Sequence, residues 1–323
     1  MKIHKKEIQR ALLFCTAFIL FAFLLSCKKK NDGTGISPNW PKKADLPGSG
    51  RETAVGFTIG TKAYIGTGYN ASYLKDFWEF DPASNVWTQK TDFGGSARYR
   101  ATGFSLGNKG YIGMGYDGAY KSDWWEYDPV SNAWTQKIST PIPGRSNASA
   151  LVIGSKAYVG TGWYHNGTTG AHYNDWWEFT PDSGTWFQKA NVPGNVRSMS
   201  FEFTIGNKGY LGGGYNQNVY LSDFYEYDPA GNTWTARASF PTLRANAPGF
   251  ELNGEGYVGT GYNGDGYMND VWKYDPAADA WEALIDFAGS KRIHANGFSL
   301  NGKGYIGLGT DGDYKKDIFE YWP

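Results

Sequence analysis

Arginine recurs in this chain with a regularity that could serve ligand binding. Each of six similar segments carries one, and they are Arg51, Arg98, Arg145, Arg197, Arg244 and Arg292. A guanidinium can hold a carboxylate through two parallel hydrogen bonds, so six of them could together bind an anion. Each segment also contains a recurring aspartate, and each arginine could pair with the aspartate of its own or the next segment instead. The equal numbers of the two residues favour this structural pairing.

A second set of candidates lies two residues after each arginine, where the segments diverge. The set is Thr53, Arg100, Asn147, Met199, Asn246 and His294. Because side chains alternate along a strand, this position lies on the same side as the arginine. If that side faces a central channel, these side chains line a polar pocket. Random drift at a half-exposed position is the alternative.

Glu202 is a further candidate, because it occupies a position that is glycine in four segments and Ala150 in another. A carboxyl group in a crowded inner strand needs a partner.

The third segment carries the longest insertion, about five residues in the stretch 162–174. It contains Trp163, Tyr164, His165, His172 and Tyr173. Function is often carried by lengthened loops on a rigid scaffold. Aromatic rings beside amide and imidazole groups suit a sugar, through stacking and hydrogen bonding, while a tolerated insertion with solvent-facing rings is the alternative. The two histidines have no evident third ligand, so we expect no metal site.

These candidates are positioned by a repeated element. The phrase Asp-x-aromatic-Glu-aromatic-Asp-Pro opens at Asp76 and returns five times with variations, at intervals of 47, 52, 48, 47 and 47 residues. A period of this length indicates a solenoid, a propeller or an array. Within residues 98–137, turn signals such as Gly107-Asn108 separate four short strand-like segments. Four antiparallel strands per repeat predict a propeller blade.

One blade is incomplete in sequence order. The fourth-strand tryptophan recurs at Trp87, Trp134, Trp186, Trp234 and Trp281, and the sequence ends at Pro323 before a sixth copy. The remaining copy lies at the other end, as Asn39-Trp40. We therefore predict that this N-terminal segment supplies the outer strand of the last blade and closes the ring, leaving no long sheet edge exposed.

These features together resemble kelch repeats. Kelch blades typically carry an arginine before the first strand, a glycine pair ending the second, an aromatic third strand leading to Tyr-Asp-Pro, and a tryptophan in the fourth. The glycines here are spaced, as in Gly66-Thr-Gly68. The resemblance covers residues 39–323 and implies an all-β, six-bladed propeller with four antiparallel strands per blade. It also implies a ligand site on the face shared by the loops between blades and those between second and third strands.

The resemblance does not specify an activity, because kelch propellers include binding modules, oxidases and sugar isomerases. Galactose oxidase needs copper held by Tyr and His and a Tyr crosslinked to Cys. The mature domain has no such Cys and only three histidines, 165, 172 and 294, so we exclude a copper oxidase. The bacterial sialic acid mutarotases are six-bladed kelch propellers with an acidic substrate. No catalytic motif of theirs can be matched, and such an activity would use arginine, His294 and Glu202.

The first 26 residues are typical of an export signal, with a basic start and an apolar run over 11–25. Leu24-Leu-Ser-Cys27 resembles the lipobox of bacterial lipoproteins, which implies that Cys27 is lipidated. An ordinary signal peptide with a chance cysteine is the alternative. Residues 27–38 are then a tether from a membrane to the propeller. Lys28 after the cysteine predicts the outer membrane of a didermic bacterium, on its surface or periplasmic face.

The remaining charges argue against nucleic acid as a partner. Without residues 1–26 the chain has 27 Lys and Arg against 30 Asp and Glu, with no basic run beyond residues 28–30. We expect no cofactor and a monomer. The main hypothesis is a non-enzymatic, lipid-anchored module that binds a saccharide or an envelope protein at the loop face. The alternatives are a mutarotase or epimerase for an acidic sugar such as sialic acid, and a purely structural surface protein.

Overall fold

A computed structural model describes residues 39–138, 140–181 and 183–323. The predicted signal segment, Cys27 and the tether lie outside the described residues. Within the described ranges, no helix is long and apolar enough to cross a membrane.

The strands follow from the local sequence pattern. In β1 (Val55–Ile59), buried and half-buried residues alternate, as in a strand with one face against a neighbouring blade. The last four residues of β2 (Lys62–Gly66) are all buried, because both faces of this strand are covered. A two-residue turn joins the first two strands of each blade, and the predicted turn at Gly107-Asn108 is confirmed between residues 106 and 109.

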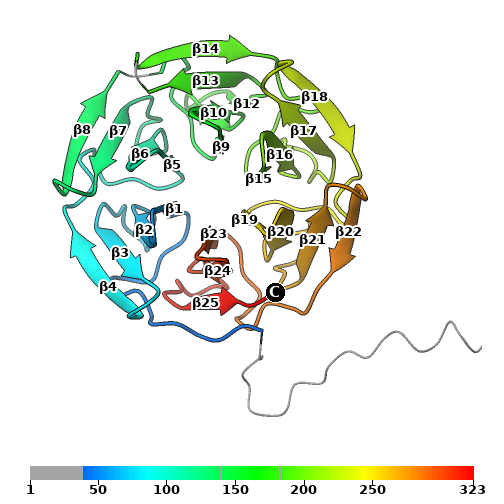
Figure 1. The fold of residues 1–323 in the computed structure, drawn as a ribbon. Helices are drawn as coiled ribbons and strands as arrows, with labels where there is room; N and C mark the ends of the chain where they lie inside the picture. Colours follow the sequence, from blue (N-terminus) through cyan, green and yellow to red (C-terminus); the bar gives the residue numbers. More distant parts are fainter. Residues whose placement is uncertain (1–38, 139, 182) are drawn as a thin grey trace, which may run out of the picture. The chain divides into compact units, whose positions relative to one another are not determined.

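Six sheets are arranged around a central axis, with the first strand of each nearest the centre and the last at the rim (Figure 1). Blade one continues with β3 (Phe77–Asp81) and β4 (Val86–Lys90). Blade two has β5 (Thr102–Leu106), β6 (Lys109–Gly113), β7 (Trp124–Asp128) and β8 (Ala133–Lys137). Blade three has β9 (Ser149–Ile153), β10 (Lys156–Gly160), β13 (Trp176–Thr180) and β14 (Thr185–Lys189), with a separate hairpin of β11 (Trp163–His165) and β12 (Gly170–His172).

The second half of the chain repeats the same arrangement. Blade four has β15 (Phe201–Ile205), β16 (Lys208–Gly212), β17 (Phe224–Asp228) and β18 (Thr233–Arg237). Blade five has β19 (Gly249–Leu252), β20 (Glu255–Gly259), β21 (Val271–Asp275) and β22 (Ala280–Ala283). Blade six has β23 (Asn296–Leu300), β24 (Lys303–Gly307) and β25 (Ile318–Tyr321). The strand pairs within every blade are antiparallel, which confirms the predicted all-β propeller.

The N-terminal segment completes blade six, as the sequence predicts. Lys43 N donates to Ile318 O at 2.8 Å and Glu320 N donates to Pro41 O at 2.9 Å, so the segment pairs with β25. Trp40 is 1% exposed, and its ring centre lies 4.8 Å from that of Tyr321. The fourth-strand tryptophans of the other five blades lie 4.8–5.0 Å from the corresponding aromatic ring. Trp40 is therefore the sixth member of this set.

The core consists of apolar layers between adjacent blades. The layer that joins blade one to blade six contains Ile65, Phe80, Phe298 and Tyr305. The indole of Trp87 packs in the same layer, and its Nε1 donates to Ala44 O at 2.9 Å. The packing of each blade thus depends on the adjacent blades. The closed ring of blades is a rigid scaffold for the loops on its two faces.

Candidate functional site

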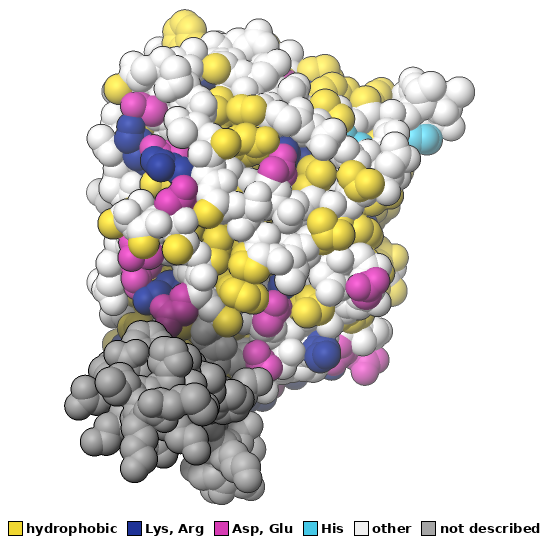
Figure 2. All heavy atoms as spheres, turned by 90° about the vertical axis from the view of Figure 1, so that its right-hand side faces the viewer, with side chains coloured by type: hydrophobic (Ala, Val, Ile, Leu, Met, Phe, Trp, Pro, Cys, Tyr) yellow, Lys and Arg dark blue, Asp and Glu magenta, His cyan; other side chains and the backbone are white. Residues whose placement is uncertain are grey.

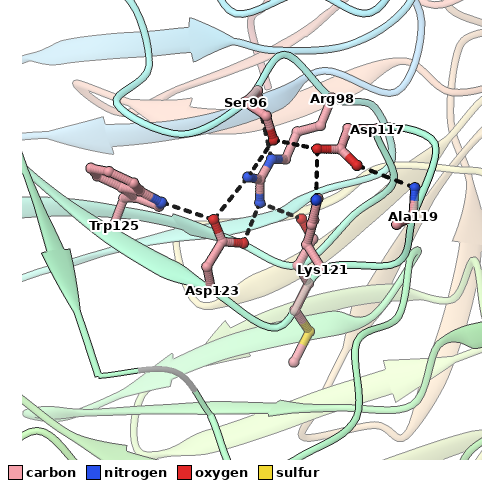
Figure 3. Close-up of polar contacts among 8 residues, drawn as sticks. Ser96, Arg98, Asp117, Ala119, Lys121, Asp123 and Trp125 are labelled. Atoms are coloured by element: carbon pink, nitrogen blue, oxygen red, sulfur yellow. Dashed lines mark hydrogen bonds and ion pairs between the residues drawn. The ribbon is translucent and has the colours of Figure 1, made fainter.

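The six repeated arginines are buried, and each is paired with an aspartate. In blade two, Arg98 Nη1 donates to Asp123 Oδ1 at 2.6 Å and Arg98 Nη2 donates to Asp123 Oδ2 at 2.9 Å. Figure 3 shows this pair, with Trp125 Nε1 donating to the same carboxylate at 2.9 Å. The equivalent pairs are Arg51–Asp76, Arg145–Asp175, Arg197–Asp223, Arg244–Asp270 and Arg292–Asp317.

These contacts place both Nη groups of every arginine on a carboxylate within the scaffold, although Arg244 Nε has no partner among the described residues. The structure therefore has the structural pairing that the sequence offered as one of two interpretations, and each arginine fixes the loop before a blade to that blade's third strand. Burial alone would raise the pKa of Asp123, but the hydrogen bonds and charge of Arg98 hold it below its usual value.

The six variable residues after the arginines surround the mouth of the channel. All six have positive φ, between 51° and 62°. The amide of each donates to the carbonyl of the equivalent residue in the preceding blade, at 3.0–3.4 Å, so the six form a closed circle of backbone hydrogen bonds. We call them the mouth residues: Thr53, Arg100, Asn147, Met199, Asn246 and His294.

The mouth residues line a cavity of about 150 Å³. The predicted polar pocket is thus present, although the reasoning from strand alternation does not hold. A positive φ interrupts the alternation, so that the arginine points into its blade whereas the mouth residue lines the cavity.

His294 belongs to a charged group at this mouth. Its Nδ1 lies 2.6 Å from Glu52 Oε2. Burial lowers the pKa of His294 and the nearby Arg100 lowers it further, while the hydrogen bond and charge of Glu52 oppose both. Burial would raise the pKa of Glu52, yet His294 and Arg100 together hold it below its usual value. At neutral pH the carboxyl is therefore ionised and the imidazole is uncharged.

Below the mouth lies an axial cavity of about 200 Å³, lined mainly by small residues of the first strands. Glu202 is the one charged side chain among its lining residues. Its Oε2 has no hydrogen-bond partner among the described residues. Burial raises the pKa of Glu202 to about 7, opposed by hydrogen bonds from Ser149 and the amide of Ala150. The carboxyl is thus placed to exchange a proton near neutral pH.

Replacing Glu202 with Gln should stabilise the protein at high pH. A carboxyl whose folded pKa is raised binds a proton on folding, so wild-type stability falls as pH rises from about 4.5 to about 7. E202Q removes this dependence. Its free energy of unfolding should exceed that of wild type by about 1–3 kcal/mol at pH 8 and differ little at pH 4.5. Urea denaturation at both pH values measures it. Parallel pH profiles for the two proteins would contradict the burial of this carboxyl.

A belt of aromatic side chains surrounds the mouth on the same face. In five of the six blades, the residue after the glycines of the second strand is aromatic and pairs with the residue that precedes a mouth residue, as in the bridges Tyr99–Tyr116 and Glu52–Tyr69; blade six has Thr310 there. The ring contacts form two arcs, one from Tyr314 through Tyr69 to Tyr164 and one from His165 through Tyr215 to Tyr267, with ring centres 4.5–6.2 Å apart within each arc. The aromatic belt consists of Tyr69, Tyr73, Tyr99, Tyr116, Tyr120, Trp163, Tyr164, His165, His172, Tyr215, Tyr220, Tyr262, Tyr267 and Tyr314.

The blade-three insertion extends this belt. Its residues form the β11–β12 hairpin, in which the rings of Trp163 and His172 lie 4.5 Å apart. Tyr164 contacts Tyr120 of blade two at 5.3 Å. His165 is exposed. Figure 2 shows a projection at the upper right with histidine in cyan, where this hairpin extends from the loop face.

Two residues of the insertion are less available. His172 is buried, which lowers its pKa to about 4. The guanidinium carbon of Arg145 lies over the ring of Tyr173, 3.9 Å from the centre of that ring. In the part of the chain that the structure describes, no group of three or more His, Cys, Asp or Glu could hold a metal ion.

Comparison with known proteins agrees with this architecture. A model of the Kelch motif matches residues 204–241, which span most of blade four. The solved structure of YjhT covers 86% of this chain and 96% of its own, with a TM-score of 0.72 and 17% identity. The chain is a kelch-repeat six-bladed β-propeller. At this identity YjhT shares the fold alone, and a search of the curated proteins finds no match.

The spaced glycines of this kelch propeller have a structural reason. Between Gly113 and Gly115, Met114 has a φ of 58°, and its carbonyl accepts a hydrogen bond from Arg98 Nη1 at 3.0 Å. A Cβ on Gly113 would come within 2.3 Å of the Trp124 ring, and Gly115 has a φ of 88°. Both glycines are therefore required, and the residue between them helps to hold the arginine.

Sequence reasoning missed most of the belt of the kelch propeller. Apart from the six arginines, it sought function only where the repeats differ. Yet Tyr73, Tyr267 and Tyr314 occupy a shared position and are 36%, 37% and 38% exposed. The available signal was a tyrosine three residues before the third-strand aspartate in five of the six repeats, outside any predicted strand.

Proposed function

We propose that this propeller is an envelope-anchored binding module that recognises a saccharide at its loop face. The aromatic belt is the observation that carries the proposal. Its rings lie around the channel mouth, and several retain more than a third of their surface in solvent. Tyrosine combines an apolar ring with a polar hydroxyl, so it can cover the C–H face of a sugar and hydrogen bond to its hydroxyls.

The belt is also preorganised. Tyr73 contacts Tyr69, Tyr99 and Tyr116, with the Tyr99 ring stacked at 5.4 Å. Because these contacts restrict the rings before a ligand binds, little side-chain entropy is lost on binding. Loops on a rigid scaffold are a common place for such a site.

Removing exposed belt rings should weaken saccharide binding. A glycan array first identifies a ligand, and calorimetry then compares wild type with Tyr73→Ala and Tyr267→Ala. We expect each change to reduce affinity about two- to tenfold, since an aromatic contact contributes roughly 0.5–1.5 kcal/mol. Phe187→Ala is the matched control, because this ring is 55% exposed on the rim strand β14, away from the loop face.

The outcome also separates the classes of ligand. Equal affinity in the belt variants and the control would contradict the loop face as the binding site. A silent array, together with a co-purified envelope protein that the belt variants no longer retain, would replace the saccharide with a protein ligand.

Membrane attachment through Cys27 is part of this proposal, supported by the resemblance of residues 24–27 to a lipobox. One lipid chain gives weak membrane binding, so two or more are needed for stable anchoring. Metabolic labelling with an alkyne fatty acid tests it, and a label that persists in Cys27→Ser would overturn the assignment. Protease treatment of whole cells then distinguishes the surface from the periplasmic face of the outer membrane.

A second candidate function is a mutarotase or epimerase acting on an acidic sugar. The observation that favours it is Glu202, a carboxyl with a pKa of about 7 in a cavity that adjoins the mouth residues His294 and Arg100. A general acid–base group works best with a pKa near the ambient pH. An NMR anomerisation assay across acidic sugars decides the matter, since no rate above buffer removes this candidate.

A further inference from the structure

Three polar atoms that line or border the mouth cavity have no partner among the described residues. They are Arg100 Nε, Asn147 Nδ2 and His294 Nε2, and all three are buried. A buried polar group without a partner is costly, so each such group in a folded protein calls for a reason. Three on one cavity wall indicate a bound polar group as the common reason.

Arg100 differs from the six scaffold arginines in this respect. Those arginines each donate to an aspartate, whereas no described residue accepts a hydrogen bond from the guanidinium of Arg100. Its guanidinium lies 4.9 Å from the ring centre of Tyr99, a member of the aromatic belt. Glu52, whose pKa the charge of Arg100 helps to lower, is hydrogen-bonded to His294 instead. The N–H groups of the Arg100 guanidinium are therefore free to donate to a ligand.

The chemistry of His294 follows from its contact with Glu52. An ionised carboxylate only accepts hydrogen bonds, so Nδ1 of His294 must carry the proton that joins the two groups. The uncharged imidazole then presents an acceptor at Nε2. The cavity thus offers two donors, from Arg100 and Asn147, and one acceptor.

We infer that the mouth cavity binds a sugar acid, with its carboxylate on Arg100 and Asn147 and a hydroxyl donating to His294. The inference rests on the proposed function and specifies the ligand class of the same site. A cavity of about 150 Å³ accommodates the carboxylate and part of one sugar ring. The contact between Arg100 and Tyr99 makes the cavity continuous with the belt, where the remaining sugar rings can stack.

Binding should be linked to protons. The charged and titratable groups that face His294 are Glu52 and Arg100, and Glu202 lies about 7 Å deeper along the strand from the shared wall residue Ser200. Acidification neutralises Glu202, whose negative charge in the adjoining cavity repels a bound carboxylate at pH 8. Affinity for a carboxylate should therefore rise as pH falls from 8 to 5.5, while that for a neutral sugar changes little.

The experiment compares sugar acids with their neutral parents by calorimetry at pH 8 and pH 5.5. The probes are methyl glucuronide against methyl glucoside and methyl galacturonide against methyl galactoside. Arg100→Met is the test variant, because Met199 occupies the equivalent position of blade four with the same positive φ. Met199→Ala is the control, since it alters the same circle of residues without removing a charge.

We expect wild type to prefer one acid over its neutral parent by tenfold or more, and Arg100→Met to abolish that preference without weakening the neutral sugar. An equal affinity for acid and parent, or a preference that survives in Arg100→Met, overturns the sugar-acid assignment and leaves saccharide binding standing.

Sodium acetate separates this site from the belt. In wild type, acetate should shift the NMR signals of the His294 ring, and in Arg100→Met it should not. That result supports the carboxylate site even if no saccharide binds, whereas an unshifted ring in wild type contradicts it.

Discussion

Replacing Asp123 with alanine should lower the free energy of unfolding by about 3–5 kcal/mol, because removing one partner leaves a buried charge unpaired. Arg98 is 1% exposed and donates two hydrogen bonds to this carboxylate. Its other contacts, to the carbonyls of Met114 and Ser96 and to the Ser96 hydroxyl, are with uncharged groups and cannot neutralise the charge. Trp125 Nε1 also loses its acceptor. The change thus affects the loop between blades, the end of the second strand and the start of the third strand at once.

Chemical denaturation of D123A and wild type at pH 7 measures this effect. Asp128→Ala is the control, because the Lys109–Asp128 pair has the same charges but is about one-third exposed on both sides. Such a surface pair contributes little to stability, because solvent screens it. If D123A and D128A lower the free energy of unfolding by the same small amount, the buried Arg–Asp pairs do not hold the blades together.

The pH dependence has a definite sign. The pKa of Asp123 is lowered in the folded protein, so the pair contributes stability above the ordinary carboxyl pKa and loses it as pH falls through the folded pKa. The difference between wild type and D123A should therefore narrow below about pH 4. The double variant Arg98→Met with Asp123→Ala should recover part of the loss at pH 7, since no unpaired charge remains.

The blade architecture was predictable because its signals are local and repeated. The period gives the number of blades, and turn residues such as Gly107-Asn108 mark the strand ends. The closure of the ring by Trp40 was predictable because five tryptophans occupy one position and a sixth lies at the opposite end of the sequence. The contact that confirms it, with the Tyr321 ring at 4.8 Å, repeats that of the other blades.

The site was only partly predictable. The mouth residues were found because they differ, but their positive φ could not be read from Arg100 or Met199, because these residue types are uncommon in that conformation. The exposure of Tyr73 was hidden because a shared aromatic residue in a repeat is usually part of the core. Whether a repeated ring faces a neighbouring blade or solvent depends on the path of the loop, which no periodic pattern describes.

The paired arginines also change where a ligand should be sought. A sequence with six arginines around one axis suggests an anion site of high charge, yet each of those charges is neutralised within its own blade. What remains at the mouth is the Glu52–His294 pair and Arg100, whose guanidinium has no hydrogen-bond acceptor among the described residues, above the Glu202 carboxyl of the axial cavity. Specificity therefore depends on a few variable residues carried by a constant frame.

Replacing Trp40 with alanine should cost about 3–5 kcal/mol, the usual range when a large buried aromatic residue is truncated. The indole packs between Phe287 of the loop after blade five and Tyr321 of β25, at 5.3 and 4.8 Å. It also anchors the segment that pairs with β25, the edge strand of the last sheet. Losing that anchor exposes an unpaired edge as well as a cavity.

The two consequences can be measured separately. Denaturation gives the loss of stability, and Trp322→Ala is the control, because this tryptophan is 48% exposed beside the same edge and should cost about 1 kcal/mol. Hydrogen exchange reports the edge itself. Two amides report it: Glu320 N donates to Pro41 O, and Trp322 N donates to Asn39 O. Both should exchange faster in W40A than in wild type. Amides of β16 in blade four should keep their protection unless the whole propeller unfolds. Unchanged exchange at these two amides, with a stability loss no larger than that of the control, would mean that the ring is closed by backbone pairing alone and that the sixth tryptophan is dispensable.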